Sequence, residues 1–79
     1  MYDEQVKIVE EAVKALADEP DTTLIRDLKD EQTAAATGLE YYGITRMVFE
    51  RFLRERQLQA TTQKKLWNAI KAVRFMFES

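Results

Sequence analysis

Apolar side chains recur at spacings of three and four residues in the first part of the chain, the period of an α-helix with one buried face. This stripe comprises Tyr2, Val6, Val9, Val13 and Leu16. The pattern predicts a helix from Asp3 to Ala17. We expect it to end before Pro20, because a proline disfavours helical backbone in the residue that precedes it.

A second apolar group begins at Leu24 and predicts another helix, which Asp21 or Thr22 can cap. The pattern leaves two ends open for this helix, one near Lys29 and one as far as Ala36.

Gly38 and Gly43 bracket a four-residue segment, and we expect one or both of them to mark a turn. After Gly43, a wide apolar arc predicts a helix to about Gln57. Its members are Ile44, Val48, Phe49, Phe52 and Leu53. A last helix is predicted from Thr61 or Thr62 to Phe77, with an apolar stripe of Leu66, Ile70, Val73 and Phe77.

These elements predict an all-α fold, a single compact domain of four or five helices over residues 1–79. The low counts of two glycines and one proline agree with few turns. The alternation with a period of two that is typical of strands is absent from the sequence.

The composition of the chain excludes several kinds of catalytic and metal-binding site. The chain has no cysteine and no histidine, which excludes zinc fingers, disulfides, thiol nucleophiles and imidazole bases. We therefore expect no enzyme, no metal site and no cofactor. The apolar runs are too short for a membrane span and the first residues are charged, so we expect no membrane association and a cytoplasmic protein.

The net charge of −2 conceals two differently charged halves. Residues 1–42 carry four basic and eleven acidic side chains, a net charge of −7, whereas residues 43–79 carry eight basic and three acidic ones, a net charge of +5. This asymmetry indicates a protein that works by binding something.

From Gly43 the chain reads Gly-Ile-Thr-Arg-Met-Val-Phe-Glu-Arg-Phe-Leu-Arg, and a helix that begins at threonine follows. Residues 34–73 resemble the lambda-repressor-like helix-turn-helix proteins, with Gly43 in the turn. The resemblance implies that Ile44, Phe49 and Phe52 face inward. A second register, with Gly38 in the turn, forces Phe49 outward, so the Gly43 register is preferred.

The helical period independently places Arg46, Met47, Glu50 and Arg54 on the outward face, with Arg51 at its margin. Arginine suits both guanine edges and phosphates. The predicted nucleic-acid contacts are Thr45, Arg46, Met47, Glu50, Arg51, Arg54, Lys64 and Lys65. The leading hypothesis is a small homodimeric DNA-binding regulator of transcription, of the kind found in phages and mobile elements, that binds double-stranded DNA.

The second hypothesis is an acidic helical protein-interaction module, an adaptor or inhibitor that binds a macromolecular partner without DNA. Trp67 and Phe75 lie off the main apolar stripe of the last helix, and large exposed aromatic side chains are typical of a partner interface. The distribution of charge in the folded protein separates the two hypotheses. Acidic side chains that interrupt the basic patch favour the interaction module.

Overall fold

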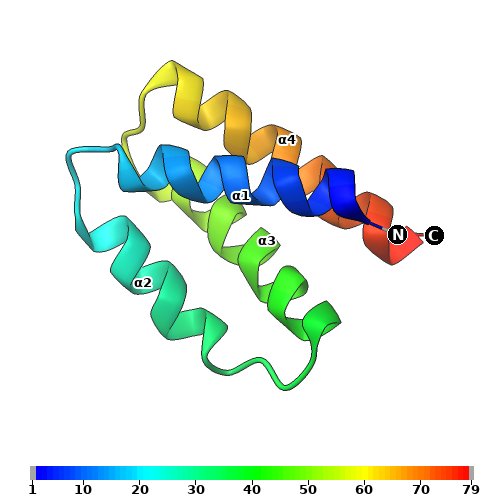
Figure 1. Cartoon of the computed structure of the whole chain (residues 1–79). Coiled ribbons are helices and arrows are strands. Elements are labelled where there is room, and N and C mark those ends of the chain that lie inside the picture. Colours follow the sequence, from blue (N-terminus) through cyan, green and yellow to red (C-terminus); the bar gives the residue numbers. More distant parts are fainter. Residues whose placement is uncertain (1, 79) are drawn as a thin grey trace.

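The computed structural model describes residues 2–78 and confirms the all-α prediction. It contains four helices, α1 (Asp3–Ala17), α2 (Thr23–Gln32), α3 (Gly38–Glu55) and α4 (Ala60–Glu78), as Figure 1 shows. Helix α1 has the predicted bounds, whereas α2 ends between the two positions considered for it. The described residues contain no strand.

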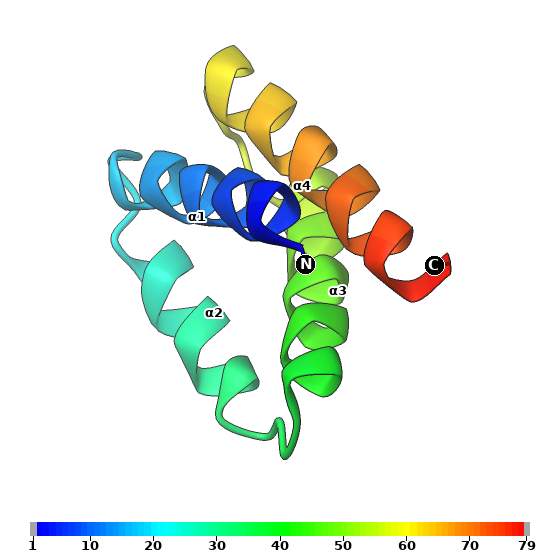
Figure 2. The same cartoon turned by 45° about the vertical axis from the view of Figure 1, so that its right-hand side comes forward.

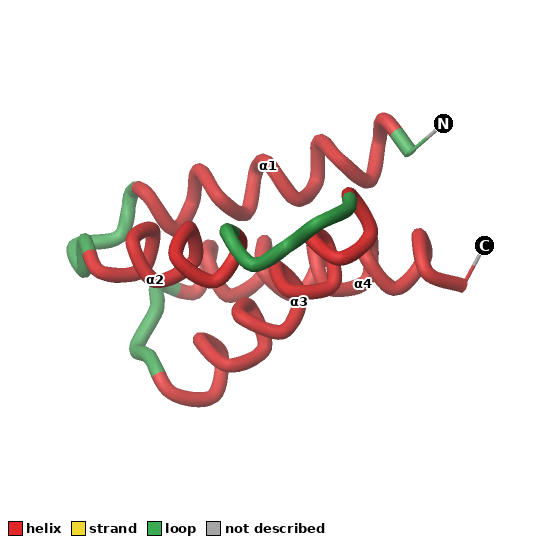
Figure 3. The backbone as a smooth tube through the Cα atoms, turned by 90° about the horizontal axis from the view of Figure 1, so that it is seen from below, coloured by secondary structure: helices red, strands yellow, loops and turns green. Residues whose placement is uncertain are grey.

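Helices α1 and α4 pack most extensively against each other and run in opposite directions (Figure 1). The start of α1 and the end of α4 therefore lie at the same end of the molecule (Figure 3). Helix α3 packs against α4, and α2 lies on the side of α3 away from α4 (Figure 2). One side of α4 is thus left without a neighbouring helix.

The hydrophobic core draws side chains from all four helices. Its buried members in these helices include Val9, Leu16, Leu24, Leu28, Val48, Phe49, Phe52, Leu66, Ile70 and Val73. Phe49 and Phe52 have no exposed surface. Since the full burial of one such side chain stabilises a fold by roughly 1.5–3 kcal/mol, these two rings from α3 are central to stability.

Helix α3 runs through Gly43 without a break, so the predicted turn at Gly43 is wrong. A Cβ atom at this position would lie 3.3 Å from Cζ of Phe77. The glycine thus allows the end of α4 to approach α3 closely. The turn lies instead at residues 33–37, directly before Gly38, and the hydroxyl of Thr37 caps α3 by accepting the backbone N–H of Glu40 at 3.2 Å.

Arg56, just after α3, connects this helix to the start of α2. Its guanidinium donates to Asp21 Oδ2 at 3.1 Å and to Asp27 Oδ2 at 2.6 Å, and it lies 5.1 Å from the centre of the Phe52 ring. Hydrogen bonds from Thr23, with a smaller contribution from Arg56, lower the pKa of Asp21. The hydrogen bond from Arg56 lowers the pKa of Asp27.

Candidate functional site

The residues predicted to contact nucleic acid differ widely in exposure. Met47 is 63% exposed and Arg54 is also exposed, whereas Arg46, Glu50 and Arg51 are only partly accessible. Nε of Arg46 is enclosed and has no hydrogen-bond partner among the described residues. The outward face of α3 is therefore more apolar and less basic than the sequence suggests.

Thr45 has no exposed surface, so its predicted role as a nucleic-acid contact is wrong. Its hydroxyl donates to the carbonyl oxygen of Tyr41 at 2.7 Å and accepts a hydrogen bond from Gln32 Nε2 at 2.8 Å. Both bonds satisfy a polar group inside the fold, and the second joins α2 to α3. Thr45 is a structural residue.

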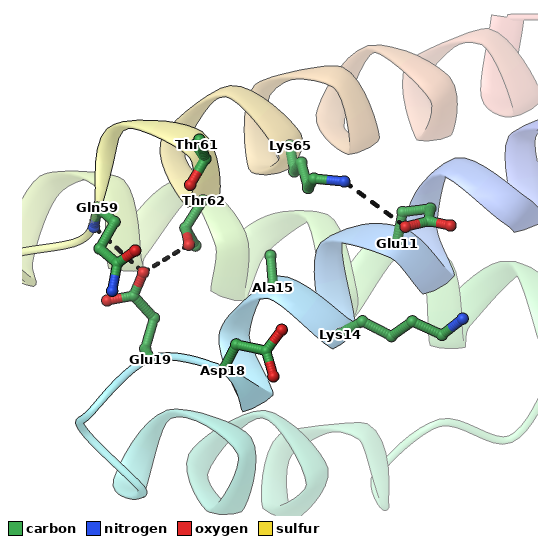
Figure 4. Close-up of a pocket in the computed structure, with 9 residues that line it drawn as sticks. All are labelled: Glu11, Lys14, Ala15, Asp18, Glu19, Gln59, Thr61, Thr62 and Lys65. Atoms are coloured by element: carbon green, nitrogen blue, oxygen red, sulfur yellow. Dashed lines mark hydrogen bonds and ion pairs between the residues drawn. The ribbon is translucent and has the colours of Figure 1, made fainter.

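Acidic side chains interrupt the predicted basic patch. Arg51 forms an ion pair with Glu31 of α2, with Nη1 and Oε2 2.6 Å apart. Lys65 lies 3.6 Å from Oε2 of Glu11 and is directed to α1 (Figure 4). Glu50 follows Arg46 by four residues and precedes Arg54 by four, so it lies between them on one side of α3.

A pocket lies between the end of α1 and the start of α4, and Figure 4 shows the side chains that line it. The carboxylate of Glu19, which is 7% exposed, is directed to the first turn of α4. Its Oε2 accepts the backbone N–H of Gln59 at 3.1 Å and the hydroxyl of Thr62. Glu19 thus anchors α4. Its two partners in this pocket, the backbone N–H of Gln59 and the hydroxyl of Thr62, already form hydrogen bonds within the fold.

The side of α4 that faces away from the core presents aromatic and basic side chains together. We call this set of residues the α4 outer face: Lys64, Trp67, Lys71, Arg74, Phe75 and Glu78. Trp67 is 52% exposed and Phe75 is 53% exposed. Both predicted interface residues are therefore accessible on the same helix, and Lys71, Arg74, Phe75 and Glu78 line a shallow depression there.

None of the three cations of the α4 outer face has an acidic partner in the described part of the chain, whereas Arg51 of α3 is paired with Glu31. Within residues 2–78, Lys64, Lys71 and Arg74 form no ion pair. Lys71 and Arg74 were not among the predicted site residues. The spacing of residues 64, 67, 71, 74 and 78, in steps of three and four, was the signal in the sequence that could have found them.

In the part of the chain that the structure describes, no three acidic side chains gather where they could hold a metal ion. None of the helices of residues 2–78 is long and apolar enough to cross a membrane.

Comparison with known proteins does not identify the chain by similarity. It matches no protein-family model, and no curated protein and no solved structure is detectably similar to it.

Proposed function

We propose that this protein is an interaction module that binds a partner protein through the α4 outer face. The observation that carries the proposal is the half-exposed pair Trp67 and Phe75, set among cations that have no partner within the described fold. A large aromatic side chain buries about 150–250 Å² when it is fully covered, and about half of each of these two side chains is still exposed, so a partner that covers both gains binding energy from apolar burial. Aromatic residues and arginine are also the residue types that dominate protein interfaces energetically.

The arrangement of charge favours this proposal over DNA regulation through α3. Phosphate binding needs cations that are free to replace counterions. On α3 and at the start of α4, two of the predicted cations are already paired, Arg51 with Glu31 and Lys65 with Glu11. Glu50 adds a negative charge between Arg46 and Arg54.

The proposal requires no catalytic step. Binding would rest on the burial of apolar area, which provides affinity, and on electrostatic complementarity, which provides specificity.

Paired surface substitutions test the proposal. Trp67→Ser/Phe75→Ser removes both aromatic side chains of the α4 outer face. Leu39→Ser/Met47→Ser is the matched control, since Leu39 is 55% and Met47 is 63% exposed and both lie on α3. Wild type and both variants, each tagged, are used to capture partners from cells that express the protein naturally, and the recovered proteins are quantified with and without nuclease.

We expect one protein to be recovered by the wild type and by the α3 variant, to be lost with the α4 variant, and to resist nuclease treatment. Circular dichroism should show that both variants keep their helices, because a surface substitution changes the free energy of unfolding by only about 0.5 kcal/mol and each variant carries two. Loss with the α3 variant alone, or recovery of nucleic acid in place of a protein, would overturn the proposal.

A further inference from the structure

The exposed side chains of α4 are arranged along the whole length of the helix. Ala60, Lys64, Trp67, Lys71, Arg74 and Glu78 follow one another in steps of four and three residues, and all of them are exposed. This spacing keeps side chains on one side of a helix, and it is the spacing at which two helices remain in contact over several turns. From residue 60 to 78 the face extends about 27 Å at the helical rise of 1.5 Å per residue. Its shape therefore suits a partner helix of about 18 residues.

The charge of the face defines what that partner helix must carry. Lys64 and Lys71 are one heptad apart, and Arg74 lies nearly one turn beyond Lys71. None of these three cations is paired within residues 2–78, and Glu78 is the acidic member of the face. Since like charges opposite one another oppose binding, a complementary helix carries acidic residues at matching intervals.

The aromatic side chains add a second requirement. Trp67 lies between Lys64 and Lys71, and Phe75 directly follows Arg74. A purely acidic segment would leave both rings in water. A partner that covers them needs apolar side chains on the same side as its acidic ones, which is the pattern of an amphipathic helix.

Helices α1 and α2, which carry most of the acidic side chains of residues 1–42, do not meet this requirement. Helix α1 exposes Glu4, Glu10 and Glu11, and α2 exposes Asp30 and Glu31, but the leucine and isoleucine side chains of both helices pack in or against the core. The large exposed apolar side chains of the described residues lie on α3 and α4. Neither α1 nor α2 of a second copy therefore offers a large apolar side chain to cover Trp67 and Phe75.

We infer that the α4 outer face binds an acidic amphipathic helix of another protein, with its acidic residues against Lys64, Lys71 and Arg74 and its apolar residues over Trp67 and Phe75. This inference rests on the proposed function and names the class of partner.

Trp67 is the only tryptophan of the chain and lies in the centre of the proposed interface, so its fluorescence reports binding directly. The full-length protein is titrated with an 18-residue tryptophan-free peptide that has leucine on one helical face and glutamate beside it. Three further probes are a scrambled peptide of the same composition, a peptide with lysine in place of each glutamate, and a DNA duplex. We expect the amphipathic acidic peptide alone to shift the Trp67 emission to shorter wavelength, with an affinity that weakens as salt is raised.

Charge reversal supplies the matched pair of variants. Lys71→Glu/Arg74→Glu should weaken binding of the acidic peptide at least tenfold, as read from the titration midpoint. Lys7→Glu/Lys14→Glu changes the net charge of the protein by the same amount, on exposed positions of α1, and should leave the midpoint within a factor of two or three.

Equal binding of the scrambled or lysine peptide, or equal weakening by both variants, would overturn the inference. A failure of every peptide to bind would overturn it as well, while the capture experiment with the α4 and α3 variants could still show a protein partner of another class. Binding of the duplex in place of the peptides would contradict both the inference and the proposed function.

Discussion

Replacement of Gly43 by alanine tests the continuous path of α3. Glycine in the interior of a helix is less favourable than alanine by about 0.8–1.0 kcal/mol, because it loses more backbone freedom on folding. In the structure Gly43 is helical and no described glycine has a positive φ. Helix propensity alone should therefore make Gly43→Ala more stable than the wild type by this amount.

The contact with Phe77 sets the opposing cost. The new Cβ would lie 3.3 Å from Cζ and 3.7 Å from Cε2 of that ring, so the ring must move by a few tenths of an ångström. Phe77 is 48% exposed and lies near the end of α4, which lets it move. We expect a net stabilisation of about 0.5–1 kcal/mol from the difference in helix propensity. For a domain of this size that corresponds to a rise in Tm of about 2–8 °C.

Urea denaturation followed by circular dichroism measures the effect, with two companion variants. Gly38→Ala is the reference without a contact, since nothing lies within 4 Å of a Cβ at that position. Gly43→Ala in a Phe77→Ala background removes the ring and should show the full gain. If the chain instead turned at Gly43 through a left-handed conformation, alanine would destabilise the protein by about 1–2 kcal/mol in both backgrounds, and that result would refute the continuous helix.

Two further predictions concern the connections between helices. Arg56→Met should lower stability at neutral pH and reduce the loss of stability between pH 7 and pH 3, mainly through Asp27, because the pKa of Asp21 is lowered chiefly by Thr23, which the variant keeps. Both pKa values lie below the ordinary 3.8, so the stabilisation by these carboxylates is fully present above that pH and is lost as the pH falls through the lowered values. Urea titrations at pH 7 and pH 3 measure this, and an unchanged difference between the two would contradict the role of Arg56. Glu19→Ala should cost about 1–3 kcal/mol, because Thr62 and the backbone N–H of Gln59 lose their acceptor. Glu19→Gln keeps an acceptor oxygen and should cost less in the same denaturation assay; equal losses would show that these hydrogen bonds contribute little.

Local patterns in the sequence were sufficient to predict most of the fold. The stripe of α1 and the proline after it specify that helix because both signals lie within a few residues of its ends. Gly43 was misinterpreted because a glycine serves equally as a turn residue and as a site of close helix packing. The contact that distinguishes them involves Phe77, from another helix.

The candidate site could be predicted only in part, because some of its features also depend on contacts between helices. The exposure of Trp67 and Phe75 follows from their position relative to the apolar stripe of one helix. The burial of Thr45 was missed because a threonine counts as polar, although it lies three and four residues before Val48 and Phe49 on the buried side of α3. The pairing of Arg51 with Glu31 depends on how α2 packs against α3, which the periodicity of a single helix does not contain.

Site-specific photo-crosslinking in cells tests most directly the claim that α4, and not α3, carries the binding surface. A photo-reactive amino acid replaces Lys71, at the centre of the α4 outer face, or Met47, at the exposed side of α3. We predict a single protease-sensitive, nuclease-resistant adduct from position 71 and none from position 47. An adduct from position 47 alone, or an adduct with DNA from either position, would contradict the account.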